Sequence, residues 1–172
     1  GILDSLSRPG HNLTGIGEYD TTIHAKRLQV LKEAVPSVAR IAVISYHQGP
    51  NDRGQWRRDL DAAARAMKLD VVWIAVDARE EFDAAFATIV RERADAIYAT
   101  ATHVNSENAR LIADFALRRR LPSFGMAEEG MLLSYESNCV ETMKRAAALT
   151  GKVLAGANPG DLPFEQPTSF DL

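Results

Sequence analysis

The chain has 172 residues, of which 46% are hydrophobic, so it has the length of one ordinary domain and enough apolar side chains for a buried core. Its formal net charge of −3 argues against a strongly basic surface for nucleic acid or anionic membranes, and no apolar run is long enough to cross a bilayer. Its single cysteine, Cys139, excludes an internal disulfide and a cysteine cluster that binds metal.

The first periodic segment lies near the N-terminus. Apolar residues with helical spacing at Leu28, Leu31 and Val35 predict a helix over 26–35 whose apolar side faces inward, and Pro36 ends it. Because the sequence begins with glycine and not with methionine, we expect it to be a processed or trimmed piece of a longer chain.

From residue 40 onward, short β-rich runs alternate with amphipathic segments. Three apolar runs predict strands, and the run at 40–45 is of the type that is buried on both faces of a parallel sheet. The segments between and after them have apolar residues at helical spacing, which predicts amphipathic helices. The predicted strands cover 40–45, 70–76 and 96–100, and the predicted helices cover 56–67, 82–94 and 111–120.

The last third of the chain continues this pattern and then changes character. Two short strands are predicted over 122–126 and 131–135, followed by a helix over 140–154. The tail from 158 to 172 contains prolines and no helical period, so we expect an extended strap. The predicted helix over 140–154 would end near Gly156. Its apolar face is made of Val140, Met143, Ala147 and Leu154.

Strands separated by helices of this length predict right-handed crossovers and a parallel sheet covered on both faces. The predicted fold class is α/β: a three-layer α/β/α sandwich with a parallel, flavodoxin-like sheet and, as the favoured strand order, 2-1-3-4-5. Ligands of such sheets bind beyond the carboxyl ends of the strands, at the switch point between the first and third strands.

The residues at this edge carry no signature of catalysis. The sequence lacks the glycine-rich phosphate loops and the Gly-x-Ser-x-Gly elbow of hydrolases. Asp77 follows the second strand without an obvious acidic partner, which argues against a phosphoacceptor. Of the four histidines, only His47 and His103 are placed to meet, and two are too few for a zinc site. We therefore expect no enzyme, no metal and no cofactor.

The same edge is rich in polar and aromatic side chains. Hydroxyl, amide and ring groups of this kind suit the reversible binding of a small polar solute, although loops at strand ends are polar in every α/β domain. The candidate ligand-binding residues are Tyr46, His47, Asn51, Thr100, Thr102, His103, Tyr135, Glu136 and Asn138.

Two of these interpretations leave alternatives open. Tyr135 could stack on a planar solute, but it could equally pack in the core. Glu128, Glu129 and Glu136 have no lysine nearby, which suits a solute with an amine, but solvated surface acids are the commoner role.

Five stretches, in chain order, resemble a family of ABC-transporter substrate-binding proteins. Residues 6–15 are similar to the family's hinge motif SLARPGGNVTG, and residues 26–36 to its KRLELLKEAVP. Residues 82–96 are similar to FDAAFAAIARERADAL, and residues 133–138 and 161–168 to LMSYGPN and DLPVEQPT. A collinear match over essentially the whole chain is specific.

The resemblance implies the second lobe of a longer, two-lobed receptor of the type I periplasmic-binding-protein kind. It implies a hinge or crossover segment over 1–22, an α/β solute-binding lobe over 23–157 and a strap over 158–172 that returns toward the first lobe. The family includes receptors for aromatic amino acids. The implied partners are a small solute, such as an amino acid or amine, and the ABC permease subunits in the membrane, not nucleic acid. A homodimer of the piece stays open.

The implied location is periplasmic or otherwise extracytoplasmic, directed by a leader in the full-length protein. The alternative is the effector-binding domain of a transcriptional regulator, which would need a DNA-binding head. A doubly wound enzyme is a second alternative, but no nucleophile–base pair is visible. Residues 46–51, 101–103 and 136–137 depart from the family's motifs, and all lie at the predicted ligand edge, so we expect the solute to differ from those of better-known members.

Overall fold

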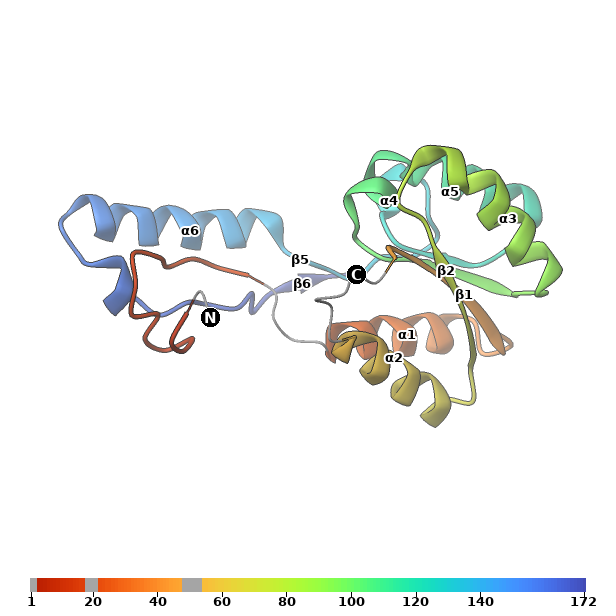
Figure 1. The fold of residues 1–172 in the computed structure, drawn as a ribbon, viewed down its shortest axis with the longest axis horizontal. Helices are drawn as coiled ribbons and strands as arrows, with labels where there is room; N and C mark the ends of the chain where they lie inside the picture. The colour runs from red at the N-terminus through yellow and green to blue at the C-terminus, as the bar shows by residue number, and fades with distance from the viewer. Residues whose placement is uncertain (1–2, 18–21, 48–53) are drawn as a thin grey trace. The chain divides into compact units, whose positions relative to one another are not determined.

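The computed structural model describes residues 3–17, 22–47 and 54–172 (Figure 1). The chain divides into two compact units, a larger one over 21–135 and a smaller one made of 1–20 together with 136–172. Among the described residues, no helix is both long and apolar enough to span a membrane.

The larger unit is built around a parallel sheet with the strand order β2-β1-β3-β4. The strands are β1 (Arg40–Ser45), β2 (Asp70–Ala75), β3 (Ala96–Ala99) and β4 (Ser123–Phe124). This order agrees with the first four positions of the predicted 2-1-3-4-5. At the fifth position the structure has a single parallel bridge, between Phe124 and Leu133, instead of a full strand over 131–135. The neighbouring β4 is only two residues long, so it offers little ladder to extend.

Helices cover both faces of this sheet, as Figure 1 shows, which confirms the three-layer α/β prediction. One face carries α1 and α2, and the opposite face carries α3, α4 and α5. Two short 3₁₀ helices are also present: η1 precedes α3, and η2 follows β4. The bounds are α1 (Thr22–Ala34), α2 (Gln55–Ala66), η1 (Arg79–Glu81), α3 (Phe82–Arg91), α4 (His103–Glu107), α5 (Ala109–Arg119) and η2 (Ala127–Glu129).

Alternate residues of β1 belong to two separate hydrophobic clusters. Ile41 and Val43 pack with the buried leucines of α1 and α2, including the predicted Leu28 and Leu31. Ala42 and Ile44 pack with the aromatic side of α3 and α5, where the rings of Phe86 and Phe115 stack with centroids 4.1 Å apart. Full burial of one such large side chain stabilises the fold by about 1.5–3 kcal/mol. Because both faces of β1 are covered, its sequence is apolar from Ile41 to Ile44 and does not alternate.

The helix α4 was not predicted, and its local chemistry explains both its formation and the failure. The side-chain oxygen of Thr102 accepts a hydrogen bond from the backbone N–H of Asn105, 3.1 Å away, and thereby caps the helix. The segment is short and mostly polar, so it has no apolar period from which a helix could be predicted. At the end of α5, Arg120 adopts a left-handed conformation with φ of 55°, and Pro122 follows, as the predicted stop requires.

The smaller unit combines one long helix with segments from both ends of the chain. It contains α6 (Cys139–Leu154), the 3₁₀ helix η3 (Pro159–Asp161), and an antiparallel pair, β5 (Glu136–Ser137) and β6 (Phe170–Asp171). A parallel bridge joins Ile16 to Glu165. The tail is extended apart from η3 and β6, in agreement with the predicted strap, and Gly156 follows the end of α6 with φ of 99°.

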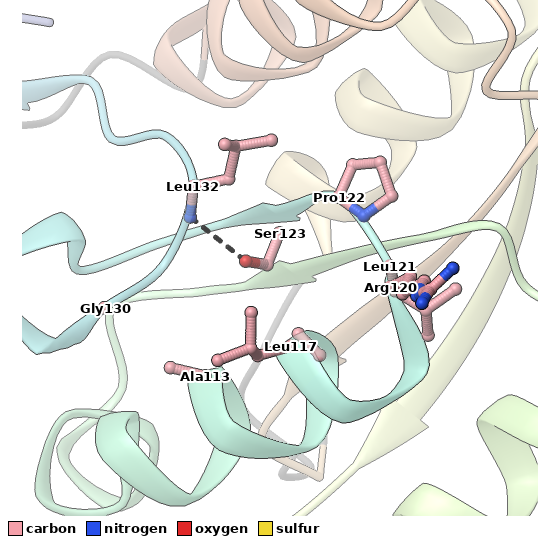
Figure 2. A pocket seen from close by; sticks show the side chains of 9 residues that line it. Ala113, Leu117, Arg120, Leu121, Pro122, Ser123, Gly130 and Leu132 are labelled. Carbon is pink, nitrogen blue, oxygen red and sulfur yellow. Dashed lines mark hydrogen bonds between the residues drawn. The ribbon is translucent and has the colours of Figure 1, made fainter.

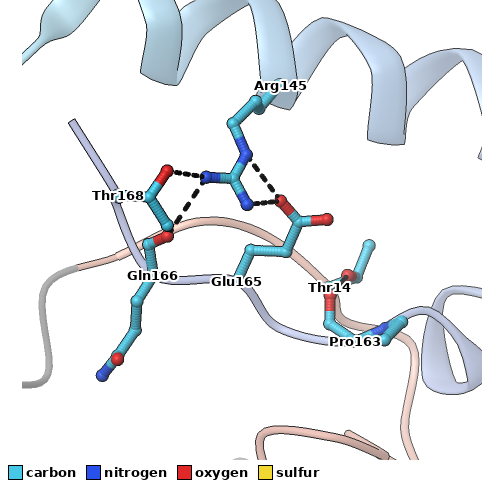
Figure 3. A network of polar contacts seen from close by, with 6 residues as sticks. All are labelled: Thr14, Arg145, Pro163, Glu165, Gln166 and Thr168. Carbon is cyan, nitrogen blue, oxygen red and sulfur yellow. Dashed lines mark hydrogen bonds and ion pairs between the residues drawn. The ribbon is translucent and has the colours of Figure 1, made fainter.

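An arginine on α6 fastens the tail to the helix, as Figure 3 shows. The Nε and Nη2 atoms of Arg145 donate to one carboxylate oxygen of Glu165 over 2.9 and 2.5 Å, and Nη1 donates to Thr168 Oγ1 over 2.9 Å. On the other side of the tail, Thr14 Oγ1 donates to the carbonyl oxygen of Leu162 over 3.1 Å. The tail is therefore held between α6 and the N-terminal segment.

The predicted apolar face of α6 is exposed in this structure. Val140 and Met143 are each 64% exposed and Leu154 is 83% exposed, whereas Leu149 on the same helix is buried at 4%. Within the described part of the chain, only a narrow stripe of α6 is therefore covered. The helix α6 groups with the two chain ends in the smaller unit.

Candidate solute-binding site

The carboxyl ends of β1, β2 and β3 bring three loops to one edge of the larger unit. Residues 46–47 follow β1, residues 76–77 follow β2 and residues 100–103 follow β3. Since α2 starts at the end of the loop after β1, its first turn lies at this edge too. The helix α1 runs back into β1 and so begins at the same edge, which brings His24 there.

His47 forms a close pair with Asp77 at this edge. Asp77 Oδ1 accepts the backbone N–H of His47 over 2.9 Å, and Asp77 Oδ2 lies 2.9 Å from His47 Nδ1. These two contacts, led by the backbone N–H, lower the pKa of the Asp77 carboxyl below its usual value, so it is ionised at neutral pH. Both side chains remain more than half exposed, at 61% and 51%.

His47 and His103, the two histidines that could meet according to the sequence, have separate carboxylate partners in the structure. His103 lies on α4, where its Nε2 is 3.3 Å from Glu107 Oε1, one helical turn away. Each histidine thus has its own carboxylate, because His47 contacts Asp77 after β2 and His103 contacts Glu107 within α4. Among the described residues, no group of three or more His, Cys, Asp or Glu side chains could hold a metal ion.

Tyr46 and Trp56 form the aromatic part of the edge. The indole Nε1 of Trp56 donates to Tyr46 Oη over 3.2 Å, and the two ring centroids are 6.1 Å apart. Arg57 donates to the Tyr46 carbonyl oxygen over 2.5 Å, while its guanidinium lies 4.6 Å from the ring centroid of Trp73. Tyr46 and Trp56 are half-buried, so the rings are fixed in place while part of their surface stays open.

His24 extends this aromatic group from α1. Its ring centroid is 4.9 Å from that of Trp56, and its Nδ1 is 2.6 Å from the hydroxyl of the buried Tyr98. Burial, with a smaller effect of the Arg27 guanidinium, lowers the pKa of His24 to about 4. Sequence reasoning missed His24, Trp56 and Tyr98, because the partners lie far apart in the chain.

The two predicted threonines have structural roles here. Thr100 is buried, and its Oγ1 donates to the carbonyl oxygen of Ile44 over 2.9 Å, which ties the ends of β3 and β1 together. The buried Asn105 donates to the same oxygen over 3.0 Å and to the Thr100 carbonyl over 2.9 Å. Thr102 caps α4. These contacts hold the switch point rigid beside the exposed side chains.

The remaining predicted residues are distributed over both units. Tyr135 is half-buried and packs against the cluster beneath α1 and α2, and its carbonyl oxygen accepts from Arg27 over 2.9 Å. Glu136 lies in β5, and Asn138 caps α6 and donates to Asp171 over 2.8 Å, so both belong to the smaller unit. Asn51 lies outside the described residues.

A separate apolar pocket of about 300 Å³ lies beside β4. Figure 2 shows its walls, formed by the C-terminal half of α5 with Leu117, by Pro122 and Ser123, and by Gly130 and Leu132. The described residues that line it include none of the predicted ligand-binding side chains. The candidate site is thus the carboxyl edge itself, an open surface with fixed rings and one histidine–aspartate pair.

Comparison with known proteins places the chain in a family. The model of the ABC transporter substrate binding protein family matches residues 1–172. The chain belongs to this family. Substrate-binding proteins are receptors and not enzymes, in agreement with the expectation that the chain is not an enzyme.

The relatives of this substrate-binding protein are distant in sequence but close in fold. A tyrosine-binding protein of Clostridioides difficile is 25% identical over 168 residues, which is 95% of this chain and 47% of the relative. A conserved domain protein from Vibrio cholerae has a TM-score of 0.84 at 22% identity, over 99% of this chain and 57% of that one. A Streptococcus ABC domain in complex with L-Trp has a TM-score of 0.81 at 21% identity, over 99% of this chain and 59% of that one.

The chain therefore spans about half the length of the curated relative that it matches. The likeness to the two solved structures shows the fold of this substrate-binding protein, in agreement with the predicted α/β fold class.

Proposed function

We propose that the chain is the second lobe, with its hinge segments, of a two-lobed extracytoplasmic receptor that captures a small amine-bearing solute with a planar ring and delivers it to the membrane permease of an ABC importer. The observation that carries this proposal is the carboxyl edge, where the half-open rings of Tyr46 and Trp56 lie beside the exposed pair of His47 and Asp77. Fixed rings bury the apolar part of a solute, and a few placed polar groups orient it.

Two further observations support the solute class. The tyrosine-binding relative and the solved domain with L-Trp are each described with an aromatic amino acid. The edge also carries a negative charge on Asp77, whose pKa is lowered, while the guanidinium of Arg57 at the start of α2 is engaged by the Tyr46 carbonyl and the Trp73 ring. Such a surface favours a solute with an amine over one with only a carboxylate.

The two-lobed arrangement explains why the edge is open. In this proposal a first lobe covers the rings when the receptor closes about its hinge, so the solute contacts both lobes. The exposed apolar residues of α6 provide a further surface for the first lobe to cover.

The test compares the full product of the gene that encodes this chain with the 172-residue chain alone. We expect L-tyrosine, L-tryptophan or L-phenylalanine to raise the melting temperature of the full product, because ligand binding stabilises the folded state by mass action. The isolated chain should bind the same solute at least about tenfold more weakly in calorimetry, since contacts from the first lobe are missing. Equally tight binding by the isolated chain would contradict the two-lobed proposal.

Two variants of Tyr46 test the position of the site in the full product. Tyr46→Leu removes the ring and should weaken binding about three- to tenfold, the usual worth of an aromatic contact. Tyr46→Phe keeps the ring but removes the hydroxyl that Trp56 contacts, so its affinity should stay within about twofold. A full product that binds only sugars or other ring-free solutes would overturn the proposed solute class.

A further inference from the structure

The pair of His47 and Asp77 has a defined hydrogen-bond direction. The carboxylate of Asp77 is ionised and therefore only accepts hydrogen bonds. Its contact of 2.9 Å with His47 Nδ1 thus requires that Nδ1 carries the proton. In the neutral imidazole, the other nitrogen, Nε2, then has a lone pair and acts as an acceptor.

The acceptor Nε2 is available to a ligand. The side chain of His47 is 61% exposed at the carboxyl edge, next to Tyr46. Among the described residues, the contacts of His47 are made by its backbone N–H and its Nδ1, both with Asp77. Asp77 is itself held in place, because its backbone N–H donates to Glu81 Oε2 over 2.8 Å. Asp77 therefore fixes the orientation of the imidazole ring through Nδ1, while the His47 side chain stays largely exposed.

We propose that Asp77 is a positioning residue that makes His47 a hydrogen-bond acceptor for the amine of the solute. This inference rests on the proposed function and adds a specificity determinant to it: the pair selects solutes with an N–H donor at this point over analogues without one. The competing explanation is that Asp77 only orders the loop, through the bond from the backbone N–H of His47 to its Oδ1.

One substitution separates these two roles of Asp77. Asp77→Asn keeps an oxygen for the backbone N–H of His47. Its amide nitrogen, however, donates to Nδ1 and so moves the ring proton to Nε2. The loop stays ordered while the histidine changes from acceptor to donor.

The first measurement is the nitrogen-15 NMR spectrum of the imidazole side chains in the 172-residue chain without solute. The unmodified chain should show His47 with its proton on Nδ1, and Asp77→Asn should shift the proton to Nε2. His47→Gln identifies the signals by their loss. A wild-type His47 protonated on Nε2 would overturn the proposal directly, whether or not any solute binds.

The second measurement is calorimetric binding to the full gene product, with the bound aromatic amino acid and its desamino analogue. Asp77→Asn should weaken binding of the amino acid about three- to tenfold, the usual effect of one lost hydrogen bond, and leave the desamino analogue within about twofold. In a His47→Ala background, Asp77→Asn should have no further effect, because its action passes through the ring.

An equal loss from Asp77→Asn with His47 intact and in the His47→Ala background would assign Asp77 to loop order alone and overturn the proposal. An equal loss for the amino acid and its desamino analogue would do the same. If the unmodified gene product binds no aromatic amino acid or amine, the proposed function fails, and the nitrogen spectrum still decides whether Asp77 sets the tautomer.

Discussion

His24 is a half-buried histidine that the surrounding rings keep neutral. Its Nδ1 is 2.6 Å from Tyr98 Oη and its ring lies against Trp56, so a charged imidazolium would lose hydration there without gaining an anionic partner among the described neighbours. With a pKa near 4 in the folded state and about 6.5 in the unfolded state, His24 binds a proton more tightly once the unit unfolds.

This difference predicts how the stability of the larger unit depends on pH. The stabilisation is complete above about pH 6.5 and is lost progressively as the pH falls toward 4, because the unfolded state takes up the proton first. The loss should reach about 2–3 kcal/mol for this half-buried group. Urea unfolding between pH 7 and 4 measures it, followed by fluorescence of Trp56 and Trp73, which both lie in the larger unit.

The variant His24→Gln provides the control, because glutamine can still contact the Tyr98 hydroxyl but does not titrate. Its stability should fall less over the same pH range, by the amount assigned to His24. Identical pH profiles of the two proteins would contradict the prediction.

Single residues at the site could be placed from the sequence, but their partners could not. Tyr46 and His47 follow an apolar run that predicts a strand, so their position at the ligand edge was within reach. Their contacts depend on how strands and helices pack. Asp77 lies 30 residues from His47, and Tyr98 lies 74 residues from His24. Spacing within one segment carries no information about such pairs.

At the scale of elements, the hydrophobic period of α6 does not identify the residue that the helix buries. The apolar spacing of this helix correctly predicts that it forms, but the helix buries a different residue from those of the predicted face. Leu149 is 4% exposed and Leu154 is 83% exposed. A hydrophobic period shows that a helix has an apolar side, and not which part of that side is covered.

Two matched substitutions in α6 test this distinction. Leu149→Ala should destabilise the smaller unit by about 2–4 kcal/mol, because it removes buried methyl groups and leaves a cavity. Leu154→Ala should change the stability by less than about 0.5 kcal/mol in the isolated chain, because the side chain is exposed. Hydrogen exchange of the α6 amides, measured by NMR, reports both values. Similar losses for the two variants would show that Leu154 is covered in solution.

The elements of the larger unit follow the sequence closely where the period is long. The strands β1, β2 and β3 and the helices α1, α2, α3 and α5 lie at the predicted places, because each contains several regularly spaced apolar residues. The helix α4 has one threonine cap, and the bridge at Leu133 pairs with only one residue of β4. A prediction from periodicity does not detect a helix that depends on a cap or a bridge of one residue pair.

At the scale of the whole molecule, the smaller unit is assembled from the two ends of the chain. The backbone N–H of Glu165 donates to the Gly15 carbonyl over 2.8 Å, and that of Gly17 donates to the Glu165 carbonyl over 3.1 Å. Arg145 holds the same segment from the side of α6. The side chains of Arg145 and Glu165 are 29% and 27% exposed, so their ion pair is partly protected from water.

Removal of this arginine should loosen the paired ends without unfolding the larger unit. Arg145→Met should raise the hydrogen-exchange rates of the Gly17 and Glu165 amides about tenfold, which corresponds to about 1.4 kcal/mol of lost local stability. Arg145→Lys should have a smaller effect, because one ammonium group keeps the charge but not the fork of donors. Exchange rates that stay unchanged in both variants would contradict a stabilising role of Arg145.

The pairing of the chain ends also sets an order of events during synthesis on the ribosome. Thr14 contacts a residue 148 positions later, so this hydrogen bond can form only after the tail emerges. At about 5–20 residues per second, that wait lasts about 7–30 s. The larger unit is complete within this interval and has time to fold first, because its internal contacts lie within 21–135.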